Sequence, residues 1–407
     1  MTETAVPTVS QALNRHVATV RPSATLAVSA RAKELKREGR DVIALSAGEP
    51  DFDTPAPIVE AGHQALRDGF THYTPNTGIP ELREAIVAKL LRDNDVHVEP
   101  SQVICSNGAK QSVAQAILAV CGPGDEVVFP APYWVSYPEM TRLAGATPVV
   151  VPTEAADEYK MSPEALAGVL TDQTRVVLFN SPSNPTGAVY TPDEVRALAE
   201  VIAGHPRALL VADEIYEKVL FDAEHLAMAS LPGMAERTMT INGFSKAYAM
   251  TGWRLGYAAG PEWWVRAMAI VQSQFTSGPS SITQRAGVAA LEMDEAPLHE
   301  MVAAFRERRD AFLGRIRALP DVVCPEPQGA FYLFPDVSAY FGRTSPSGRD
   351  ISGSADLCLY LLDEHDVALV PGVAFGDDRG VRVSYAAGLD TLMRAADRIE
   401  AGLMALV

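Results

Sequence analysis

Lys246 lies in a segment whose composition would make a lysine reactive. Residues 243–256 (GFSKAYAMTGWRLG) surround this amine with small, aromatic and apolar side chains, and no other lysine follows Lys218 in the sequence. Burial in such surroundings disfavours the ammonium, lowers its pKa and leaves a neutral, nucleophilic amine. Ser245 and Arg254 are near enough in the chain to share one anionic ligand. This context favours a catalytic lysine over a surface lysine that extends into water.

Two polar segments directly follow strand-like runs. Asn184 lies in residues 181–187 (SPSNPTG), a composition that is also typical of a plain turn. Asp213 and Tyr216 lie in residues 212–216 (ADEIY), where an acidic residue could equally cap a helix. An acidic side chain at the end of a buried parallel strand nevertheless lies where ligands bind in such sheets.

A third segment, residues 106–111 (SNGAKQ), joins a strand-like run to a helical pattern. Gly108, Ala109 and Lys110 would form the first turn, where free amides and the helix dipole attract anions. The four segments together offer a phosphate cradle, a charge partner for a pyridine nitrogen, a donor to a ring oxygen and an amine. Pyridoxal phosphate needs this combination of groups, so we expect it as the cofactor.

The elements that carry these residues alternate between short apolar runs and helical patterns. The helices are expected near residues 111–120 and 192–202 among others. The runs cover residues 103–106, 126–130, 147–151, 175–180, 208–212, 238–242 and 255–259. Continuous apolar strands that alternate with helices predict an α/β domain with a mostly parallel, seven-stranded sheet.

The C-terminal third has a different pattern. A long charged amphipathic helix over residues 299–319 precedes short strands and helices, which predicts a smaller α+β domain. The run at residues 42–48 could pair with this part instead of the main sheet. We therefore expect an N-terminal arm with part of the small domain at 1–56, a large cofactor domain at 57–297 and a small domain at 298–407.

Composition restricts the partners. The 407 residues are 47% hydrophobic and carry a net charge of −17, with no Lys/Arg-rich run, so we expect no nucleic-acid partner. The four cysteines form no C-x-x-C pair, and no metal site is expected. Unpaired cysteines and the lack of a signal-peptide pattern favour the cytoplasm. No run is apolar and long enough for a membrane span.

The motifs resemble those of the class I and II aminotransferases that depend on pyridoxal phosphate, and most closely the bacterial aspartate and prephenate branch. They occur in the family's order over nearly the whole chain after residue 20. The matching segments are 48–52 (GEPDF), 72–75 (HYTP), 132–134 (PYW), 184–187 (NPTG), 213–216 (DEIY), Lys246 with Arg254, and 382–385 (RVSY).

The resemblance implies the pyridoxal-phosphate transferase fold, a homodimer with shared active sites and a ping-pong exchange of amino groups between amino acids and 2-oxo acids. It also implies a role for each residue of the site. Lys246 would condense with the cofactor and move the substrate proton, and Asp213 would bind the pyridine nitrogen. Asn184 and Tyr216 would bind the ring oxygen, and Trp134 would stack on the ring; the substrate α-carboxylate would be bound by Arg382 and the Gly48 amide. The phosphate would be bound by Gly108, Ala109, Ser245, Arg254 and Tyr73 of the neighbouring subunit.

Two cations bear on the substrate. In the resembled branch, a lysine at the position of Lys110 binds a distal carboxylate, and a basic residue at the position of Arg21 is linked to prephenate. We therefore expect aspartate and glutamate as substrates, with 2-oxoglutarate and oxaloacetate as acceptors. The chain departs from the branch at Arg21, where lysine is usual, at Ala109, which replaces a common glycine, and at residues 244–245, which replace a smaller pair.

Two alternatives keep the cofactor chemistry, and two others need a feature that the sequence does not show. An aminotransferase for prephenate, aromatic or specialised biosynthetic substrates would keep the whole constellation. A lyase or synthase would share Lys246, Asp213 and Asn184. A cofactor-binding regulator would need a DNA-binding domain, and the residues before 42 show no helix-turn-helix pattern. A nicotinamide dehydrogenase would need a G-x-G-x-x-G motif, which the sequence lacks.

Overall fold

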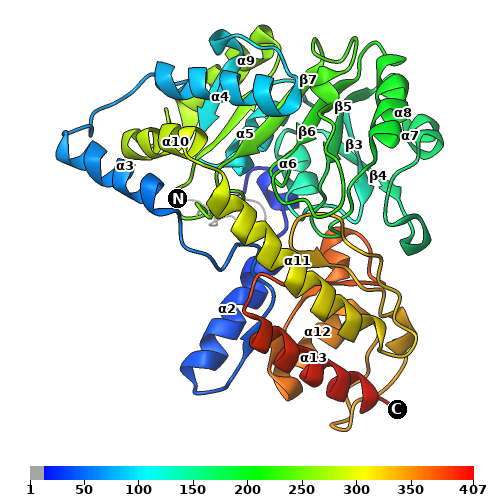
Figure 1. The fold of residues 1–407 in the computed structure, drawn as a ribbon. Helices are drawn as coiled ribbons and strands as arrows, with labels where there is room; N and C mark the ends of the chain where they lie inside the picture. The colour runs from blue at the N-terminus through cyan, green and yellow to red at the C-terminus, as the bar shows by residue number, and fades with distance from the viewer. Residues whose placement is uncertain (1–12) are drawn as a thin grey trace, which may run out of the picture.

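The computed structural model describes residues 13–407, so the first twelve residues of the predicted N-terminal arm lie outside the described part. Figure 1 shows two regions joined by the long helix α11 (Ala296–Arg317). One region holds a large sheet between helices, and the other holds both α2 and the C-terminal helices.

The large sheet has seven strands in the order β2-β8-β7-β6-β5-β3-β4, and only β8 runs antiparallel to its neighbours. This confirms the predicted mostly parallel sheet, and each predicted run corresponds to one strand. The strands are β2 (Val103–Ser106), β3 (Glu126–Ala131), β4 (Thr147–Pro152), β5 (Thr174–Asn180), β6 (Leu209–Asp213), β7 (Thr238–Gly243) and β8 (Gly256–Ala259).

Helices cover both faces of this sheet because its central strands are apolar on both sides. In β6, Val211 packs in one buried cluster with α5 and α9, while Leu210 and Ala212 pack in another with α8. The helices of this region are α3 (Ala56–Arg67), α4 (Pro80–Asn94), α5 (Ala109–Leu118), α6 (Tyr137–Leu143), α7 (Pro163–Val169), α8 (Pro192–Ala203), α9 (Glu262–Phe275) and α10 (Ser281–Glu292).

The alternation of strand residues decides what faces the site. Asp213 comes two residues after Val211, so its side chain lies on the α5 face of β6, while Glu214 turns toward the other face. The strand therefore ends with one carboxylate on each side of the sheet.

The smaller region is a mixed α and β layer, as the sequence predicts. Its three-stranded antiparallel sheet has the order β11-β12-β9. Its elements are α2 (Ala24–Arg37), β9 (Tyr332–Leu333), α12 (Ser354–His365), β10 (Val367–Ala368), β11 (Val370–Pro371), β12 (Val381–Ser384) and α13 (Leu389–Met404).

Short 3-10 helices occur along the whole described chain, at Val17–Thr19, Pro100–Gln102, Ala155–Asp157, Met228–Ser230, Ser338–Tyr340 and Gly372–Phe375.

The N-terminal strand β1 (Ile43–Ala44) pairs in parallel with β10, so the segment expected to join the C-terminal part does so. α11 begins at Ala296, and the predicted domain boundary between 297 and 298 therefore falls in its first turn. No helix in residues 13–407 is both long and apolar enough to cross a membrane.

Candidate active site

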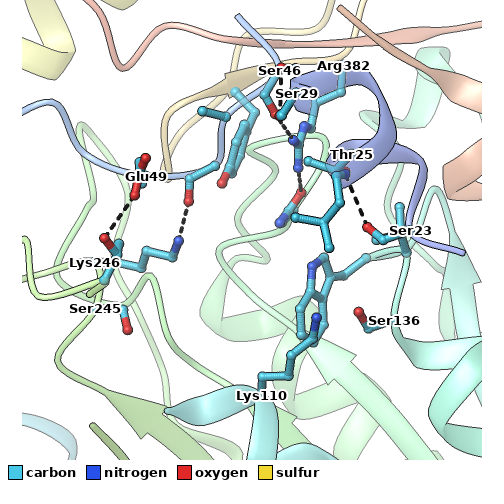
Figure 2. Close-up of a pocket in the computed structure, with 18 of the residues that line it drawn as sticks. Ser23, Thr25, Ser29, Ser46, Glu49, Lys110, Ser136, Ser245, Lys246 and Arg382 are labelled. Atoms are coloured by element: carbon cyan, nitrogen blue, oxygen red, sulfur yellow. Dashed lines mark hydrogen bonds between the residues drawn. The ribbon is translucent and has the colours of Figure 1, made fainter. Parts of the chain in front are cut away.

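A cavity of about 560 Å³ lies at the carboxyl ends of β5 and β6, with α2 and the C-terminal region as its other walls. Lys246, Lys110 and Arg382 approach it from three sides in Figure 2. Eleven of the predicted site residues line it, namely Gly48, Ala109, Lys110, Trp134, Asn184, Asp213, Tyr216, Ser245, Lys246, Arg254 and Arg382. Residues that are distant in the sequence therefore meet in one hollow.

Lys246 follows β7 and directs its amine across the cavity. Its Nζ donates a hydrogen bond to the Gly48 carbonyl oxygen and lies 5.7 Å from the centroid of the Tyr216 ring. Burial, with the positive charge of Arg382 nearby, lowers the pKa of Lys246 to about 8. A substantial fraction of neutral amine is therefore available near physiological pH, as a nucleophile requires.

Asp213 is held by groups from two neighbouring segments. The Tyr137 hydroxyl donates to Asp213 Oδ2 over 2.8 Å, and Asn180 Nδ2 donates to the Asp213 carbonyl oxygen over 2.8 Å. Burial raises the pKa of Asp213 to about 6, although the bond from Tyr137 and the charge of Lys246 oppose the shift. A cationic ligand atom beside this carboxylate would restore its ionised form.

One end of the cavity is shaped for an anion. α5 begins directly after Gly108, whose φ is 83°, and a Cβ atom there would lie 2.5 Å from Arg254 Nη2. Arg254 Nη1 donates to the Thr251 carbonyl oxygen over 2.7 Å, which fixes the guanidinium beside the helix terminus. Ser245 also lines the cavity. Helix amides, a hydroxyl and a guanidinium together suit a phosphate.

Arg382 occupies another wall and is 2% exposed. Its Nη1 donates to Asn184 Oδ1 over 3.0 Å and its Nη2 to the Ser46 carbonyl oxygen over 2.7 Å. Its Nε is buried without a hydrogen-bond partner among the described residues. Because a buried guanidinium with an unused donor binds a planar carboxylate well, Arg382 suits a carboxylate ligand.

Lys110 lies in the first turn of α5, with its Nζ 5.2 Å from the centroid of the Trp134 ring. Burial and the charge of Arg254 lower the pKa of Lys110. Among residues 13–407 this ammonium makes no ion pair, and Lys110 lines the cavity together with Trp134. A second carboxylate of a ligand could reach it there.

Three predicted site residues do not line the cavity. Gly108 lies immediately behind it and touches Arg254. Tyr73 is fully exposed on the loop before α4, beside residues 278–282. The Arg21 amide donates to Glu139 Oε2 over 2.8 Å, while Ser23 and Thr25 reach the cavity instead. The proposed roles of Tyr73 and Arg21 stay predictions.

The sequence reasoning missed three residues that support the site. Tyr137 comes three residues after the matched segment 132–134, and its hydroxyl donates to Asp213. Asn180 ends β5, and its Oδ1 accepts from the Asn184 amide over 2.9 Å. Tyr332 bonds Tyr216, hydroxyl to hydroxyl, over 2.8 Å. Asn180 could have been found from its place at a strand end, whereas Tyr332 looked like an ordinary core residue.

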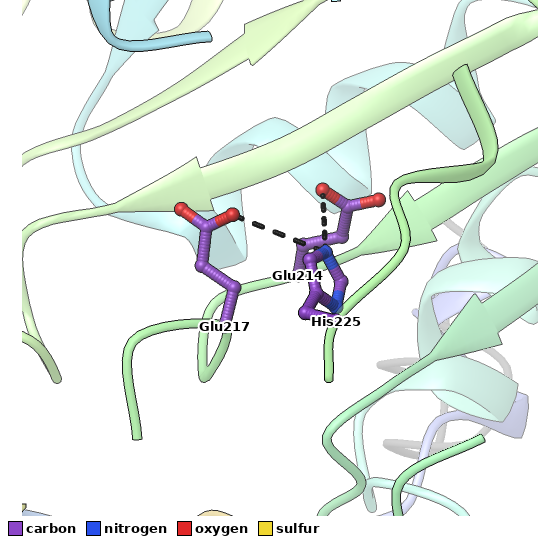
Figure 3. Close-up of side chains that lie close together, drawn as sticks. All are labelled: Glu214, Glu217 and His225. Atoms are coloured by element: carbon purple, nitrogen blue, oxygen red, sulfur yellow. Dashed lines mark ion pairs between the residues drawn. The ribbon is translucent and has the colours of Figure 1, made fainter. Parts of the chain in front are cut away.

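A separate buried cluster lies on the opposite side of β6. Figure 3 shows His225 between Glu214 and Glu217, with His225 Nε2 3.3 Å from Glu214 Oε2. The geometry resembles a metal site. Lys89 Nζ, however, donates to Glu217, which also accepts from Asn94 and Asn242. The ammonium supplies the charge that a metal would bring, so we interpret the cluster as a buried ion network.

The cavity fits the pyridoxal phosphate that the sequence led us to expect. The space between Gly108 and Arg254 would be filled by a Cβ, and the donors there match a phosphate. Asp213 supplies the only carboxylate of β5 or β6 that lines the cavity, as a pyridinium requires. The amine of Lys246 is near enough to Asp213, Arg254 and Arg382 for their charges to affect its pKa.

Comparison with known proteins identifies the family. A model described as aminotransferase class I and II matches residues 40–399. The chain belongs to this family. Its membership confirms the resemblance drawn from the motifs, and the chain is an aminotransferase.

Three relatives illustrate how close the likeness is. A Petunia hybrida protein, named bifunctional aspartate aminotransferase and glutamate/aspartate-prephenate aminotransferase, is 53% identical over 97% of this chain and 83% of its own length. The aspartate aminotransferase structure from Rhizobium meliloti has a TM-score of 0.93 at 42% identity, covering 97% and 99% of the two chains. The Thermus thermophilus aspartate aminotransferase solved with maleate has a TM-score of 0.90 at 43% identity, covering 96% and 99%. The aminotransferase therefore has the predicted fold.

Proposed function

We propose that this aminotransferase binds pyridoxal phosphate on Lys246 and exchanges the amino group of aspartate or glutamate with a 2-oxo acid in a ping-pong cycle. One observation carries the proposal. Lys246 directs a low-pKa amine into a cavity that has an anion cradle and a buried carboxylate at one side and a buried arginine at the other.

Bound pyridoxal phosphate supplies an aldehyde and a ring that accepts electrons when the substrate Cα–H bond breaks. Asp213 would keep a proton on the ring nitrogen, and the Tyr137 bond favours its ionised form. Asn184 has its Oδ1 engaged by Arg382, which leaves its Nδ2 to donate to the ring oxygen beside Tyr216. Trp134 would cover the ring face.

Lys246 then carries the substrate proton. In the empty site the amine of Lys246 has a pKa of about 8, so it could both take and return a proton near neutral pH. Arg382 would hold the substrate α-carboxylate with the Gly48 amide, which orients the Cα–H bond toward Lys246. Closure of the C-terminal region with α2 would exclude water.

Three considerations support a dicarboxylic substrate. Lys110 places a second cation at the cavity, and the aspartate aminotransferase of Thermus thermophilus was solved with maleate, which has two carboxylates. The Petunia hybrida relative is named for aspartate, glutamate and prephenate. Prephenate is therefore the second candidate, with Arg21 as its proposed recognition residue.

We also propose a cytoplasmic homodimer. Tyr73 is a fully exposed aromatic residue, and Phe275 and Ile270 are exposed on the nearby helix α9. A partner subunit on this face would cover them and let Tyr73 reach the phosphate of the partner's cofactor. The large and small regions would then correspond to the predicted domains 57–297 and 298–407, with 1–56 shared between the arm and the small domain.

Two experiments test the proposal. Borohydride reduction of the yellow protein followed by peptide mapping should place the reduced cofactor on Lys246, and an adduct on another lysine would refute the assignment. Single amino acids should then be mixed with the enzyme while the cofactor absorbance is followed. Rapid conversion by aspartate and glutamate but not alanine supports the dicarboxylate specificity, whereas conversion mainly by aromatic amino acids refutes it.

A further inference from the structure

Tyr332 touches both functional ends of the cavity. Its hydroxyl lies 2.8 Å from the Tyr216 hydroxyl, and its ring centroid lies 4.7 Å from the Arg382 guanidinium carbon. A Cβ atom at Gly48 would lie 2.7 Å from the Tyr332 hydroxyl oxygen. This one side chain therefore contacts the proposed ring-oxygen donor, the proposed carboxylate clamp and the backbone that accepts from Lys246.

The surroundings of Tyr332 require a hydroxyl group, which packing in the core alone would not. Tyr332 and Tyr216 are both buried, with 0% and 3% of their surfaces exposed, so each hydroxyl needs a partner. Phe331, the preceding residue, packs in the same cluster with a side chain that has no polar atom. Phenylalanine would fill the space of the Tyr332 ring, and only the hydroxyl makes the bond to Tyr216.

We propose that Tyr332 is a positioning residue that couples carboxylate binding at Arg382 to the hydrogen bond from Tyr216 to the ring oxygen. The inference rests on the proposed function. Either hydroxyl of the pair can be the donor. When Tyr216 directs its proton to the ring oxygen, Tyr332 becomes the donor to Tyr216 and strengthens that bond.

The Tyr332 ring gives the second half of the coupling. Arg382 lies over this ring, and its guanidinium carbon is also 5.1 Å from the centroid of the Phe375 ring. The two aromatic faces hold the guanidinium while its two terminal nitrogens bond Asn184 and Ser46. A shift of Tyr332 would therefore displace two groups together: the Tyr216 hydroxyl, which donates to the ring oxygen, and the Arg382 guanidinium, which binds the carboxylate.

Tyr332→Phe tests the role of the hydroxyl in the cofactor-loaded enzyme. The first readout is the pH midpoint at which the cofactor absorbance changes when bound to Lys246. Loss of a donor that stabilises the deprotonated form should raise this midpoint by about half to one pH unit. The second readout is the dissociation constant of maleate, which should rise by about 3- to 10-fold because the coupling is lost.

Tyr385→Phe is the matched control. Tyr385 is fully buried in the same cluster, and within residues 13–407 its hydroxyl donates only to the Ala330 carbonyl oxygen, over 3.3 Å. This variant should leave both the midpoint and the maleate affinity unchanged. It therefore separates loss of the Tyr216 contact from loss of a buried hydroxyl.

A double variant shows whether Tyr332 acts through Tyr216. Adding Tyr332→Phe to Tyr216→Phe should cause no further shift of the midpoint, because the contact is already gone. An unchanged midpoint in the single variant, or shifts that simply add in the double variant, would overturn the inference. Because both results require a chromophore on Lys246, they are distinguishable from failure of the proposed function.

Discussion

The Tyr137 hydroxyl donates to Asp213 Oδ2 over 2.8 Å, where burial has already raised the pKa of that carboxyl to about 6. The two effects oppose each other. Burial favours the neutral acid, whereas the bond from Tyr137 favours the carboxylate that a pyridinium needs. The ionised form of Asp213 therefore destabilises the cofactor-free protein, but it would be stabilised by a cationic ligand.

Asp213→Asn should stabilise the cofactor-free protein at alkaline pH. The carboxyl pKa is about 6 in the fold and about 3.9 when unfolded, so Asp213 stabilises the fold below about pH 4 and loses this contribution as the pH rises through 6. At pH 8 the ionised side chain should cost about 2–3 kcal/mol of unfolding free energy. Thermal unfolding at pH 5 and pH 8 should show a larger gain for the variant at pH 8.

The exposed Asp172 gives the control for this experiment, because its carboxylate makes no ion pair or hydrogen bond with another described residue. Asp172→Asn should change the unfolding temperature equally at both pH values. An Asp213→Asn variant that is less stable than the natural protein at pH 8 would contradict the argument. The cofactor affinity of Asp213→Asn should fall in the same samples, because a neutral amide cannot balance the charge of a pyridinium.

Gly108→Ala should weaken cofactor binding without unfolding the protein. Gly108 has a φ of 83°, and a Cβ there would lie 2.5 Å from Arg254 Nη2, so the guanidinium must leave the cradle. Loss of one charge-assisted phosphate contact predicts an affinity about 10- to 100-fold lower, measured by fluorescence titration of the cofactor-free protein. Gly168→Ala on α7, where a Cβ would meet nothing within 4 Å, should bind normally. If Gly108→Ala and Gly168→Ala bind pyridoxal phosphate with equal affinity, the site between Gly108 and Arg254 does not bind the phosphate.

These contacts separate what the sequence could predict from what it could not. The strands were predictable because each is a short apolar run, and the polar ends of β2, β5 and β6 were predictable because Gly108, Asn184 and Asp213 lie at or just after those ends. Tyr137 and Tyr332 lie among apolar neighbours, where an aromatic residue usually means packing. Their hydroxyl contacts depend on tertiary distances, which no local pattern contains.

Lys110→Gln should separate substrates by their number of carboxylates. The ammonium faces the cavity beside Trp134, so it can contact a side-chain carboxylate but has nothing to bind in alanine. Loss of one such bond predicts kcat/KM for aspartate about 10- to 100-fold lower, with little change for alanine. Lys36→Gln removes the same charge from α2, at another wall of the cavity. If Lys36→Gln lowers kcat/KM for aspartate as much as Lys110→Gln does, the effect comes from the general positive charge of the cavity and not from a specific contact of Lys110.

Lys89→Met should destabilise the protein through Glu217 and not through the active site. Lys89 is 3% exposed and donates to Glu217, and the nearby positive charges hold the pKa of Glu217 below its usual range although burial opposes this. Removing the ammonium leaves a buried carboxylate without its main cation, which predicts a loss of about 3–5 kcal/mol in chemical denaturation.

The double variant Lys89→Met with Glu217→Leu should recover much of this loss, because both buried charges are then gone. Lys160→Met breaks ion pairs of Lys160 with the more exposed Glu158 and Glu194, and should cost no more than about 1 kcal/mol. The network also contains His225, whose pKa is raised by Glu214 and Glu217 in spite of burial. Its stabilising charge is present below about pH 6.5 and is lost as the pH rises through the raised folded pKa. If Lys89→Met lowers the free energy of unfolding by no more than Lys160→Met does, the ionised Glu217 does not depend on the Lys89 ammonium.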